Sequence, residues 1–431
     1  MQDPHAAVEA VFRIEFPRLV AGLARLTREV GRAEELAQDA LVVALERWPT
    51  DGVPDNPGAW LMTTAKRRAL DGLRRARIAD AKHLQLARET DAGVPDVARA
   101  LVDALDDDVG DDLLRLVFAA CHPVLPTEAR VALTLRLVGG LTTAEIARAF
   151  LVPEPTIAQR IVRAKRALTD AQVPFEVPRA AERAERLESV LEVIYLIFNE
   201  GHVATAGARW TRPELCTDAL RIARVVAGLA PAEPEVHGLV ALLELSASRL
   251  PARVAADGTP VLLADQDRSR WDRVLVRRGL AALARADELA AASGTAAGPY
   301  QLQAAIAAHH ARALTAEATA WPRIAALYTL LAQRAPSPIV ELNRAVALAM
   351  AFGPAAGLEL VDALVAEAAL AGYHLLPAVR GDLLAKLGRG AEAREEFLRA
   401  AALTRNERER EVLLARARQC PQTASSLPSG S

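Results

Sequence analysis

The stretch "GLTTAEIARAFLVPEPTIAQRIVRAKRAL", residues 140–168, predicts two short helices joined by a tight turn. Thr142 is a good helix N-cap, and Glu145 three positions later completes a capping box, so the first helix begins there. Pro153 ends that helix, and Pro155 with Thr156 opens the second. Two short helices, a tight turn and a cationic second helix are the layout of a helix-turn-helix.

The second helix of this pair has an apolar face and a cationic face. Ile157, Ile161, Ala164 and Leu168 are spaced to point inward. We expect the remaining polar side chains to point outward, where Arg160 and Arg163 share one face and can reach base edges or phosphates. Solvated surface helices carry such faces too, but here the cap, the turn and the basic face coincide, which favours DNA binding. The outward set is Gln159, Arg160, Arg163, Lys165 and Arg166.

The composition predicts an all-α chain with more than one domain. The chain has 431 residues, only 4% of them aromatic, and apolar residues recur at spacings of three and four over most of its length. The exception is 252–265, where Asp257-Gly258 between short β-branched runs predicts a small hairpin.

Charge and cysteine usage exclude several classes of protein. Lys and Arg number 52 against 54 Asp and Glu, so any electrostatic signal for a partner must be local. The three cysteines are far apart and lack metal-binding spacing, which predicts neither a disulfide framework nor a zinc site. The N-terminus has no basic-then-apolar leader, and charges interrupt every apolar run. We therefore expect a soluble cytoplasmic protein that does not enter a membrane.

A local charge reversal marks a domain boundary. "NPGAWLMTTAKRRALDGLRR", residues 56–75, combines Trp60 with a dense cationic cluster, and 58–82 holds seven cations against two acids. Over 83–112 the balance inverts to nine acids against two cations, with Gly93, Pro95 and Gly110 among them, which predicts a linker. Cations that follow phosphates beside an aromatic suit melted DNA, although for Trp60 itself core packing is the favoured explanation over contact with a base.

The helix expected over 32–48, "RAEELAQDALVVALERW", has an acidic strip. Leu36, Ala40, Val43 and Ala44 are spaced to be buried. Glu35 and Asp39 lie one turn apart on the exposed side, with Gln38 beside them. Alone, this strip is an ordinary solvated face.

Near the C-terminus, 379–403 resembles a tetratricopeptide helix pair. Small residues such as Gly381 let two helices approach closely, and Phe397 fills the gap between neighbouring pairs. A weaker copy over 342–364 places Gly353 35 positions before Gly388. A generic antiparallel helix hairpin is the alternative.

The order of these features resembles the extracytoplasmic-function class of RNA polymerase sigma factors, over residues 8–170. The remainder, with "VIYLIFNEGH" (193–202), "DQDRSRWD" (265–272) and "GPYQLQAAIAAHHA" (298–311), resembles the branch with a tetratricopeptide-like C-terminal extension. The domains expected from this resemblance are region 2 (1–82), an acidic linker (83–111), region 4 (112–172), a helical extension (173–300), repeats (301–418) and a disordered tail (419–431).

The resemblance implies two partners, core RNA polymerase and promoter DNA. Polymerase contacts would involve the β′ clamp helices and the β flap. The Asp106-Asp107-Asp108 run would either occupy a cationic passage of polymerase as an RNA-like polyanion or serve as a solvated tether. The implied residues are Glu35, Gln38 and Asp39 for polymerase docking; Trp60, Lys66, Arg67, Arg68, Arg74 and Arg75 for the minus-ten element; and Thr156, Gln159, Arg160, Arg163 and Arg166 for the minus-thirty-five element.

Two other readings remain open. The first is a free-standing helix-turn-helix regulator with a helical-repeat sensor, which would bind DNA tightly without polymerase. The second is an enzyme in the C-terminal helices, but no spacing there forms a metal site or a nucleophile-base pair, and helix caps explain the polar residues more simply. We therefore expect no catalytic residue and no cofactor, and a protein or peptide as the ligand of the repeats. The residues that raise the enzyme reading are Asn199, Glu200, His202, Asp267, His309 and His310.

Overall fold

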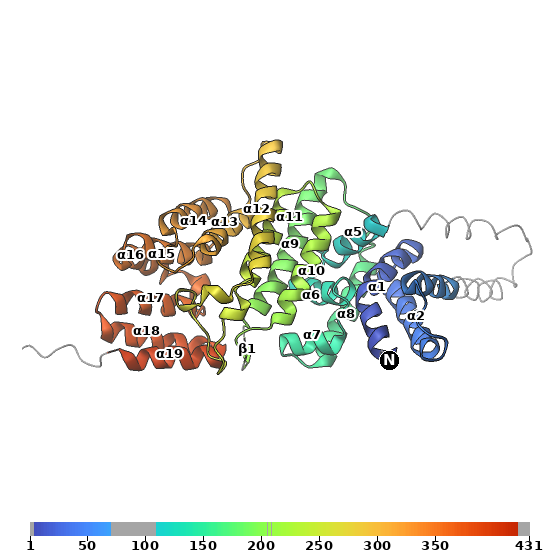
Figure 1. The fold of residues 1–431 in the computed structure, drawn as a ribbon, viewed down its shortest axis with the longest axis horizontal. Coiled ribbons are helices and arrows are strands. Elements are labelled where there is room, and N and C mark those ends of the chain that lie inside the picture. The colour runs from blue at the N-terminus through green and yellow to red at the C-terminus, as the bar shows by residue number, and fades with distance from the viewer. Residues whose placement is uncertain (1–3, 70–108, 205, 208, 421–431) are drawn as a thin grey trace, which may run out of the picture. The chain divides into compact units, whose positions relative to one another are not determined.

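The computed structural model describes residues 4–69, 109–204, 206–207 and 209–420. Its internal contacts divide the chain into two units, 1–196 and 197–431. Helices dominate both units, which confirms the all-α prediction (Figure 1). The expected acidic linker, apart from its last three residues, and the C-terminal tail beyond residue 420 lie outside the described residues.

The first unit consists of helices that pack through apolar stripes. Phe16, Leu36 and Leu116 are among its buried side chains, with almost no exposed surface. A helix that begins at residue 57 is described as far as residue 69. The other helices are α1 (Pro4–Thr27), α2 (Val30–Asp51), α5 (Val109–Ala120), α6 (Thr127–Leu137), α7 (Thr143–Phe150), α8 (Glu154–Asp170) and most of α9 (Ala180–His202).

The second unit contains the C-terminal end of α9 and the rest of the chain. Its longer helices are α10 (Pro213–Leu229), α11 (Pro234–Ala247), α12 (Arg273–Ser293), α13 (Pro299–Arg312), α14 (Trp321–Arg334), α15 (Pro338–Phe352), α16 (Pro354–Leu364), α17 (Leu375–Lys386), α18 (Gly390–Leu403) and α19 (Glu407–Gln419). Its short elements are the 3-10 turns η1 (Leu250–Ala252), η2 (Leu263–Asp265), η3 (Arg268–Arg270) and η4 (Ala368–Leu370), and the strands β1 (Ala206–Gly207) and β2 (Arg405–Asn406).

The hairpin predicted over 252–265 is present, and a second pairing was not predicted. Val254 and Pro260 form an antiparallel bridge, and Gly258 adopts the φ of 85° that this turn requires. Strand β1 pairs in parallel with β2 about 200 residues later. Asn406 secures this contact, because its side-chain amide donates to the carbonyls of Ala204 and Arg209, both at 3.0 Å. Two-residue strands carry no pattern that a sequence could reveal.

Arginines cap two helix C-termini in the second unit. Arg253 donates to the carbonyl of His202, the last residue of α9, at 3.0 Å. Arg268 donates at 2.8 Å to the carbonyls of His310 and Ala313 at the end of α13. The last carbonyls of a helix lack partners within the helix and carry partial negative charge, so a guanidinium satisfies them in both respects. The "DQDRSRWD" motif therefore contributes Arg268 to the packing of this unit.

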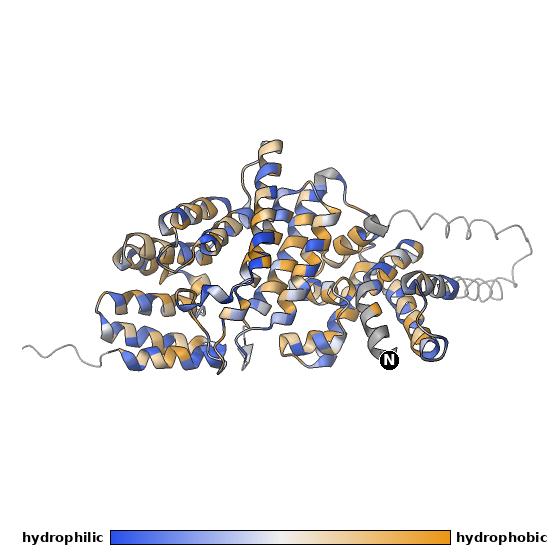
Figure 2. Ribbon diagram, viewed as in Figure 1, coloured by the Kyte–Doolittle hydropathy of each residue, from blue (hydrophilic) through white to orange (hydrophobic). Residues whose placement is uncertain are grey.

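The C-terminal helices form successive antiparallel pairs. Helices α15 and α16 pack together, as do α17 and α18, and Figure 2 shows hydrophilic and hydrophobic residues alternating along α17, α18 and α19. A Cβ atom added at Gly381 would lie 3.0 Å from the Phe397 ring, so this glycine permits the close approach of α17 and α18. Leu384 and Ala393 are buried in the same pair, as expected. The assignment to the tetratricopeptide class remains a prediction.

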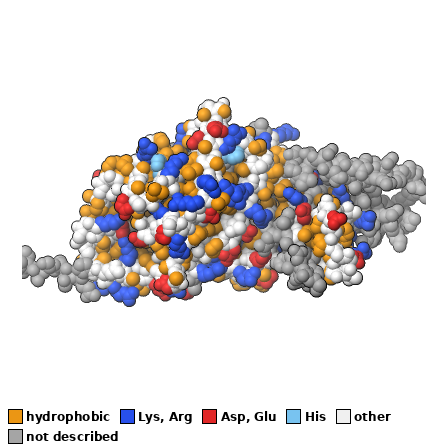
Figure 3. All heavy atoms as spheres, viewed as in Figure 1, with side chains coloured by type: hydrophobic (Ala, Val, Ile, Leu, Met, Phe, Trp, Pro, Cys, Tyr) orange, Lys and Arg blue, Asp and Glu red, His pale blue; other side chains and the backbone are white. Residues whose placement is uncertain are grey.

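No helix in the described ranges is long and apolar enough to cross a membrane. Figure 3 shows Lys and Arg side chains gathered on the visible face around α12. Two cations near this helix share an acid: Arg224 and Arg278 approach the buried carboxylate of Glu244 at 3.0 and 3.4 Å. This carboxylate is therefore paired rather than left as an isolated buried charge.

We predict that Phe397→Ala destabilises the second unit by about 3–5 kcal/mol, because Phe397 is 1% exposed and its removal leaves a cavity against Gly381. Phe352→Ala is the matched control: Phe352 is 66% exposed, so its loss should cost less than about 0.5 kcal/mol. Thermal unfolding of both purified variants provides the comparison. Equal losses of stability would contradict the close packing of α17 and α18.

Candidate functional site

Helices α7 and α8 form the predicted helix-turn-helix. Thr142 accepts a hydrogen bond from the backbone N–H of Glu145 at 3.1 Å, and the Glu145 carboxylate accepts from the backbone N–H of Thr142 at 2.8 Å. Leu151 ends α7 in the left-handed region, with φ of 52°, and Pro153 is the N-cap of α8. The predicted capping box and the two helix boundaries are therefore confirmed.

The outer face of α8 carries the side chains that were predicted to read DNA. The predicted inward residues of this helix are all buried. Among the side chains predicted to contact the minus-thirty-five element, Arg160 is half-buried and the others are exposed. Arg166 forms a long ion pair of 3.5 Å with Asp170. The helix therefore presents one continuous polar face. That face contains Thr156, Gln159, Arg160, Arg163 and Arg166.

The prediction that Lys165 points outward is wrong. Its ammonium nitrogen lies 2.8 Å from the carboxylate of Glu34, and only 22% of the side chain is exposed. Arg136 on α6 reaches the other oxygen of the same carboxylate at 2.7 Å. The pattern of α8 alone could not predict this contact, because the acid comes from α2, more than 100 residues earlier.

Glu34 is a buried acid held between two cations. Its side chain is 3% exposed, and burial alone would raise its pKa. Lys165 and then Arg136 outweigh burial and hold the pKa of Glu34 below its ordinary value. Glu34 was not predicted as a functional residue, although its position gives a signal: an acid at position 34 falls on the helical stripe that also contains Ala37 and Leu41.

The predicted acidic strip of α2 is exposed, and each of its members has a neighbour. Glu35 pairs with Arg32 at 2.9 Å. Asp39 pairs with Arg68 at 3.1 Å, which brings a predicted docking residue against a predicted DNA-binding residue. Gln38 donates to the carboxylate of Glu34 at 2.8 Å. These exposed ion pairs contribute little stability, so a larger partner can replace them at small cost.

The cationic helix that begins at residue 57 is held by its apolar side. Asn56 accepts a hydrogen bond from the N–H of Ala59 at 3.0 Å, and Leu61 is buried. Trp60 is half-buried and meets the ring of Trp48 edge-on at 5.5 Å, so it packs against the helix bundle. Arg67 is exposed, whereas Lys66 and Arg68 are half-buried. The predicted DNA-binding residues Arg74 and Arg75 lie outside the described residues.

The two predicted DNA-binding parts of the first unit contact each other. Helix α1 packs against α5, and Arg25 of α1 lies 3.6 Å from the buried carboxylate of Asp112 at the start of α5. The guanidinium of Arg136 lies 5.5 Å from the ring centroid of Phe16. Together with Glu34, these contacts join α1 and α2 to the helices around the helix-turn-helix.

Two of the polar residues that raised the hypothesis of an enzyme, Glu200 and Asp267, have structural partners. Glu200 forms an ion pair with Arg212, and Asp267 accepts a hydrogen bond from the N–H of Ser269 at the start of η3. Burial, followed by nearby arginines, lowers the pKa of His310 to about 3, so this imidazole is neutral near pH 7. Among the residues that the structure describes, no group of three or more His, Cys, Asp or Glu side chains could hold a metal.

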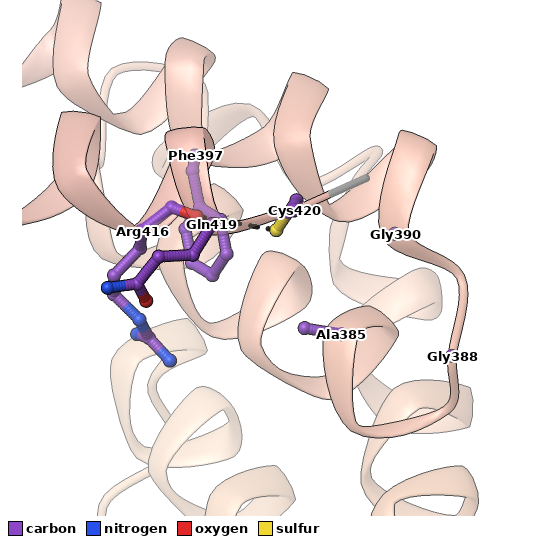
Figure 4. Close-up of a pocket in the computed structure, with 7 residues that line it drawn as sticks. All are labelled: Ala385, Gly388, Gly390, Phe397, Arg416, Gln419 and Cys420. Atoms are coloured by element: carbon purple, nitrogen blue, oxygen red, sulfur yellow. Dashed lines mark hydrogen bonds between the residues drawn. The ribbon is translucent and has the colours of Figure 1, made fainter. Parts of the chain in front are cut away.

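A cavity of about 310 Å³ lies at the C-terminal end of the helix pairs (Figure 4). Phe397 and Arg416 form one wall, where the guanidinium lies 4.6 Å from the ring centroid. Arg416 also forms an ion pair with Asp382, a carboxylate that Lys386 contacts as well at 2.8 Å. The cavity is lined by Ala385, Gly388, Gly390, Phe397, Arg416, Gln419 and Cys420.

Three family models match separate parts of the chain. Sigma-70 region 2 matches residues 12–78, and Sigma-70 region 4 matches residues 115–168. A family of unknown function matches residues 186–287. The first two matches include the acidic strip of α2, the cationic helix and the helix-turn-helix.

Relatives among curated proteins agree with these matches. An uncharacterized protein of Rhizobium meliloti (strain 1021) is 44% identical over 392 residues, 90% of each chain. The ECF RNA polymerase sigma factor SigK of Mycobacterium ulcerans (strain Agy99) is 33% identical over 156 residues, which cover 35% of this chain and 78% of SigK. SigL of Mycobacterium tuberculosis (strain ATCC 25618 / H37Rv), also an ECF sigma factor, is 29% identical over 170 residues, 39% of this chain and 84% of SigL.

No solved structure shows significant similarity to the chain. The curated relatives and the family models point to the same class, and they do so over the helices that carry the exposed acidic, cationic and helix-turn-helix faces. The chain belongs to the ECF family of RNA polymerase sigma factors.

Proposed function

We propose that this protein binds core RNA polymerase and directs it to specific promoters for the initiation of transcription. The observation that supports this most directly is the exposed cationic face of α8, which stands beside a capped α7 in the geometry of a DNA-reading helix. Run-off transcription with purified core polymerase, with and without the protein, tests the proposal. Promoter-specific transcripts only in the presence of the protein are expected, and their absence would contradict it.

The proposal assigns separate roles to the exposed faces of the first unit. The acidic strip of Glu35, Gln38 and Asp39 docks on the β′ clamp helices of polymerase, and region 4 meets the β flap. The helix that begins at residue 57 contacts the minus-ten element through Trp60, Lys66, Arg67, Arg68, Arg74 and Arg75. The face of α8 reads the minus-thirty-five element through Thr156, Gln159, Arg160, Arg163 and Arg166.

We further propose that residues 173–418 regulate the sigma regions in cis, through helical repeats over 301–418. Repeat helices form surfaces for proteins or peptides, and the cavity beside Phe397 is a candidate contact point for such a ligand. This function requires neither a cofactor nor catalysis, and it places the protein in the cytoplasm. Truncation after Gln172 tests the regulatory role, because unchanged promoter output and unchanged polymerase affinity would contradict it.

A free-standing DNA-binding regulator is the second candidate, since the helix-turn-helix alone would serve it equally well. The two candidates differ in whether DNA recognition requires polymerase. Tight and sequence-selective binding of the purified chain to duplex DNA would favour the regulator. Selective binding only in complex with polymerase favours the sigma factor.

We predict that Glu35→Lys combined with Asp39→Lys weakens association with core polymerase by about tenfold or more, because it reverses the charge of the docking strip. The fold should persist, since the ion pairs of both residues are exposed and contribute roughly 0–1 kcal/mol each. Glu46→Lys is the matched control on the same helix, where the side chain is also exposed. A pull-down at unaltered strength for the double variant would count against the docking assignment.

We predict that Arg160→Ala costs roughly 1–3 kcal/mol of affinity at the preferred minus-thirty-five sequence, if polymerase is present and the guanidinium contacts a base. Arg285→Ala, on an exposed position of α12, is the control for loss of one positive charge. The measurement is holoenzyme binding to matched and mismatched promoters. An equal loss on all sequences would identify Arg160 as a phosphate contact instead.

A further inference from the structure

Arg249, Arg253 and Arg268 form a group of neighbouring cations in the second unit. The guanidinium carbons of Arg249 and Arg268 lie 6.0 and 5.1 Å from the ring centroid of the same indole, that of Trp271. Arg253 follows Arg249 across the turn η1, and its guanidinium lies 5.9 Å from the ring centroid of Trp210. We call the three arginines the arginine cluster.

The arginine cluster lacks acids. None of its members forms an ion pair with a carboxylate in the described part of the chain. Elsewhere in the same unit a buried arginine does have an acid, because Arg212 pairs with Glu200. A charge that is withdrawn from water is costly unless an opposite charge compensates it. The cluster is therefore an uncompensated concentration of positive charge.

The members of the cluster are buried to different degrees. Arg253 and Arg268 are 8% and 7% exposed, whereas Arg249 is half-buried and can be reached from solvent. Burial, opposed by Tyr328 and reinforced by Arg268, lowers the pKa of Arg249 to about 10. Burial, followed by the charge of Arg249, lowers the pKa of Arg253 to about 9. Burial also lowers the pKa of Arg268, against the opposing charge of Glu317. Guanidinium groups stay protonated near pH 7 even so, and these charges repel one another.

The cluster also contains hydrogen-bond donors that have no acceptor. The Nε atoms of Arg253 and Arg268 and the indole N–H of Trp271 are buried, and no described residue accepts a hydrogen bond from them. Other nitrogens of the two arginines are engaged by the carbonyls at the ends of α9 and α13. A buried donor without an acceptor costs free energy, and a bound ion is one of its ordinary explanations. Unpaired charge and unsatisfied donors thus occur at the same place and favour the same kind of ligand.

We propose that the arginine cluster binds a small, doubly charged oxyanion, the phosphate group of a small molecule, with Arg249 as its accessible anchor. A guanidinium presents parallel N–H donors that match two oxygens of a phosphate, and such charge-assisted hydrogen bonds are strong. Arg253 and Arg268 attract the same group through their charges, which salt screens less because they are buried. The site lies in the second unit, so it goes beyond the proposed function and requires neither polymerase nor promoter DNA.

The test is calorimetric titration of the purified full-length chain with inorganic phosphate, at an ionic strength that chloride holds constant. Saturable binding of a single phosphate is expected for the parent chain. Arg249→Met keeps a long side chain beside Trp271 but removes the charge, so it should weaken binding by about tenfold or more. No saturable binding to the parent chain, or equal affinity of the variant, would overturn the proposal.

Thermal unfolding gives a second readout, one that separates a binding role of Arg249 from a packing role. Without phosphate, Arg249→Met should raise the unfolding midpoint of the second unit by about 2–4 °C, because it relieves the repulsion within the cluster. If Arg249 served only to pack on Trp271, its loss would lower the midpoint, and that result would overturn the proposal. Phosphate stabilises proteins in general, so the expected signal is a larger rise of the midpoint with phosphate for the parent chain than for the variant.

Arg285→Met is the matched control, since Arg285 is an exposed arginine of α12 that pairs with Glu288 at 3.4 Å. Its loss should leave the affinity for phosphate unchanged; a loss of affinity equal to that of Arg249→Met would indicate general attraction and contradict the site. Circular dichroism checks that each variant retains its helices.

A titration with adenosine 5′-monophosphate distinguishes the sources of the phosphate group. Tighter binding than that of inorganic phosphate, lost in Arg249→Met, identifies a nucleotide as the ligand class. Equal or weaker binding identifies the free ion. Neither titration involves transcription, so failure of the site and failure of the proposed function remain distinguishable.

Discussion

The carboxylate of Glu34 imposes the strongest constraint on the sigma portion of this protein. A buried acid is costly unless cations and hydrogen bonds surround it, and here the cations come from α6 and α8. The neighbouring contacts, Arg25 with Asp112 and Arg136 over Phe16, join the same sets of helices. Satisfaction of this charge, together with the packing of α1 against α5, therefore holds α1 and α2 against the helices around the helix-turn-helix.

This constraint shows what the sequence could and could not predict. Helix boundaries and buried faces follow from local rules, so the Thr142 cap, the Pro153 boundary and the inward residues of α8 were all predicted correctly. Periodicity indicates which face of a helix is covered, but not which residue covers it. Lys165 was therefore assigned to solvent, and Glu34 was overlooked although it lies on the buried stripe of α2.

In the second unit, too, local patterns predict some features, whereas contacts between distant residues determine others. The hairpin around Gly258 follows from its turn residues, and the close approach at Gly381 follows from the small residue opposite Phe397. The arginine caps at the ends of α9 and α13, and the pairing of β1 with β2, depend on contacts across many residues. No local pattern specifies them. Asp267, one of the polar residues that raised the hypothesis of an enzyme, caps the start of η3 instead.

The first unit carries the exposed acidic strip of α2, the cationic helix that begins at residue 57 and the polar face of α8. The near-neutral overall charge is consistent with a subunit that depends on polymerase for most of its affinity for DNA.

The most direct measurement is the binding of the purified chain to promoter DNA, with and without core RNA polymerase. The account predicts sequence-selective binding to promoter DNA only when core polymerase is present. Failure of the chain to bind core polymerase, together with tight and selective binding to duplex DNA by the chain alone, would contradict it.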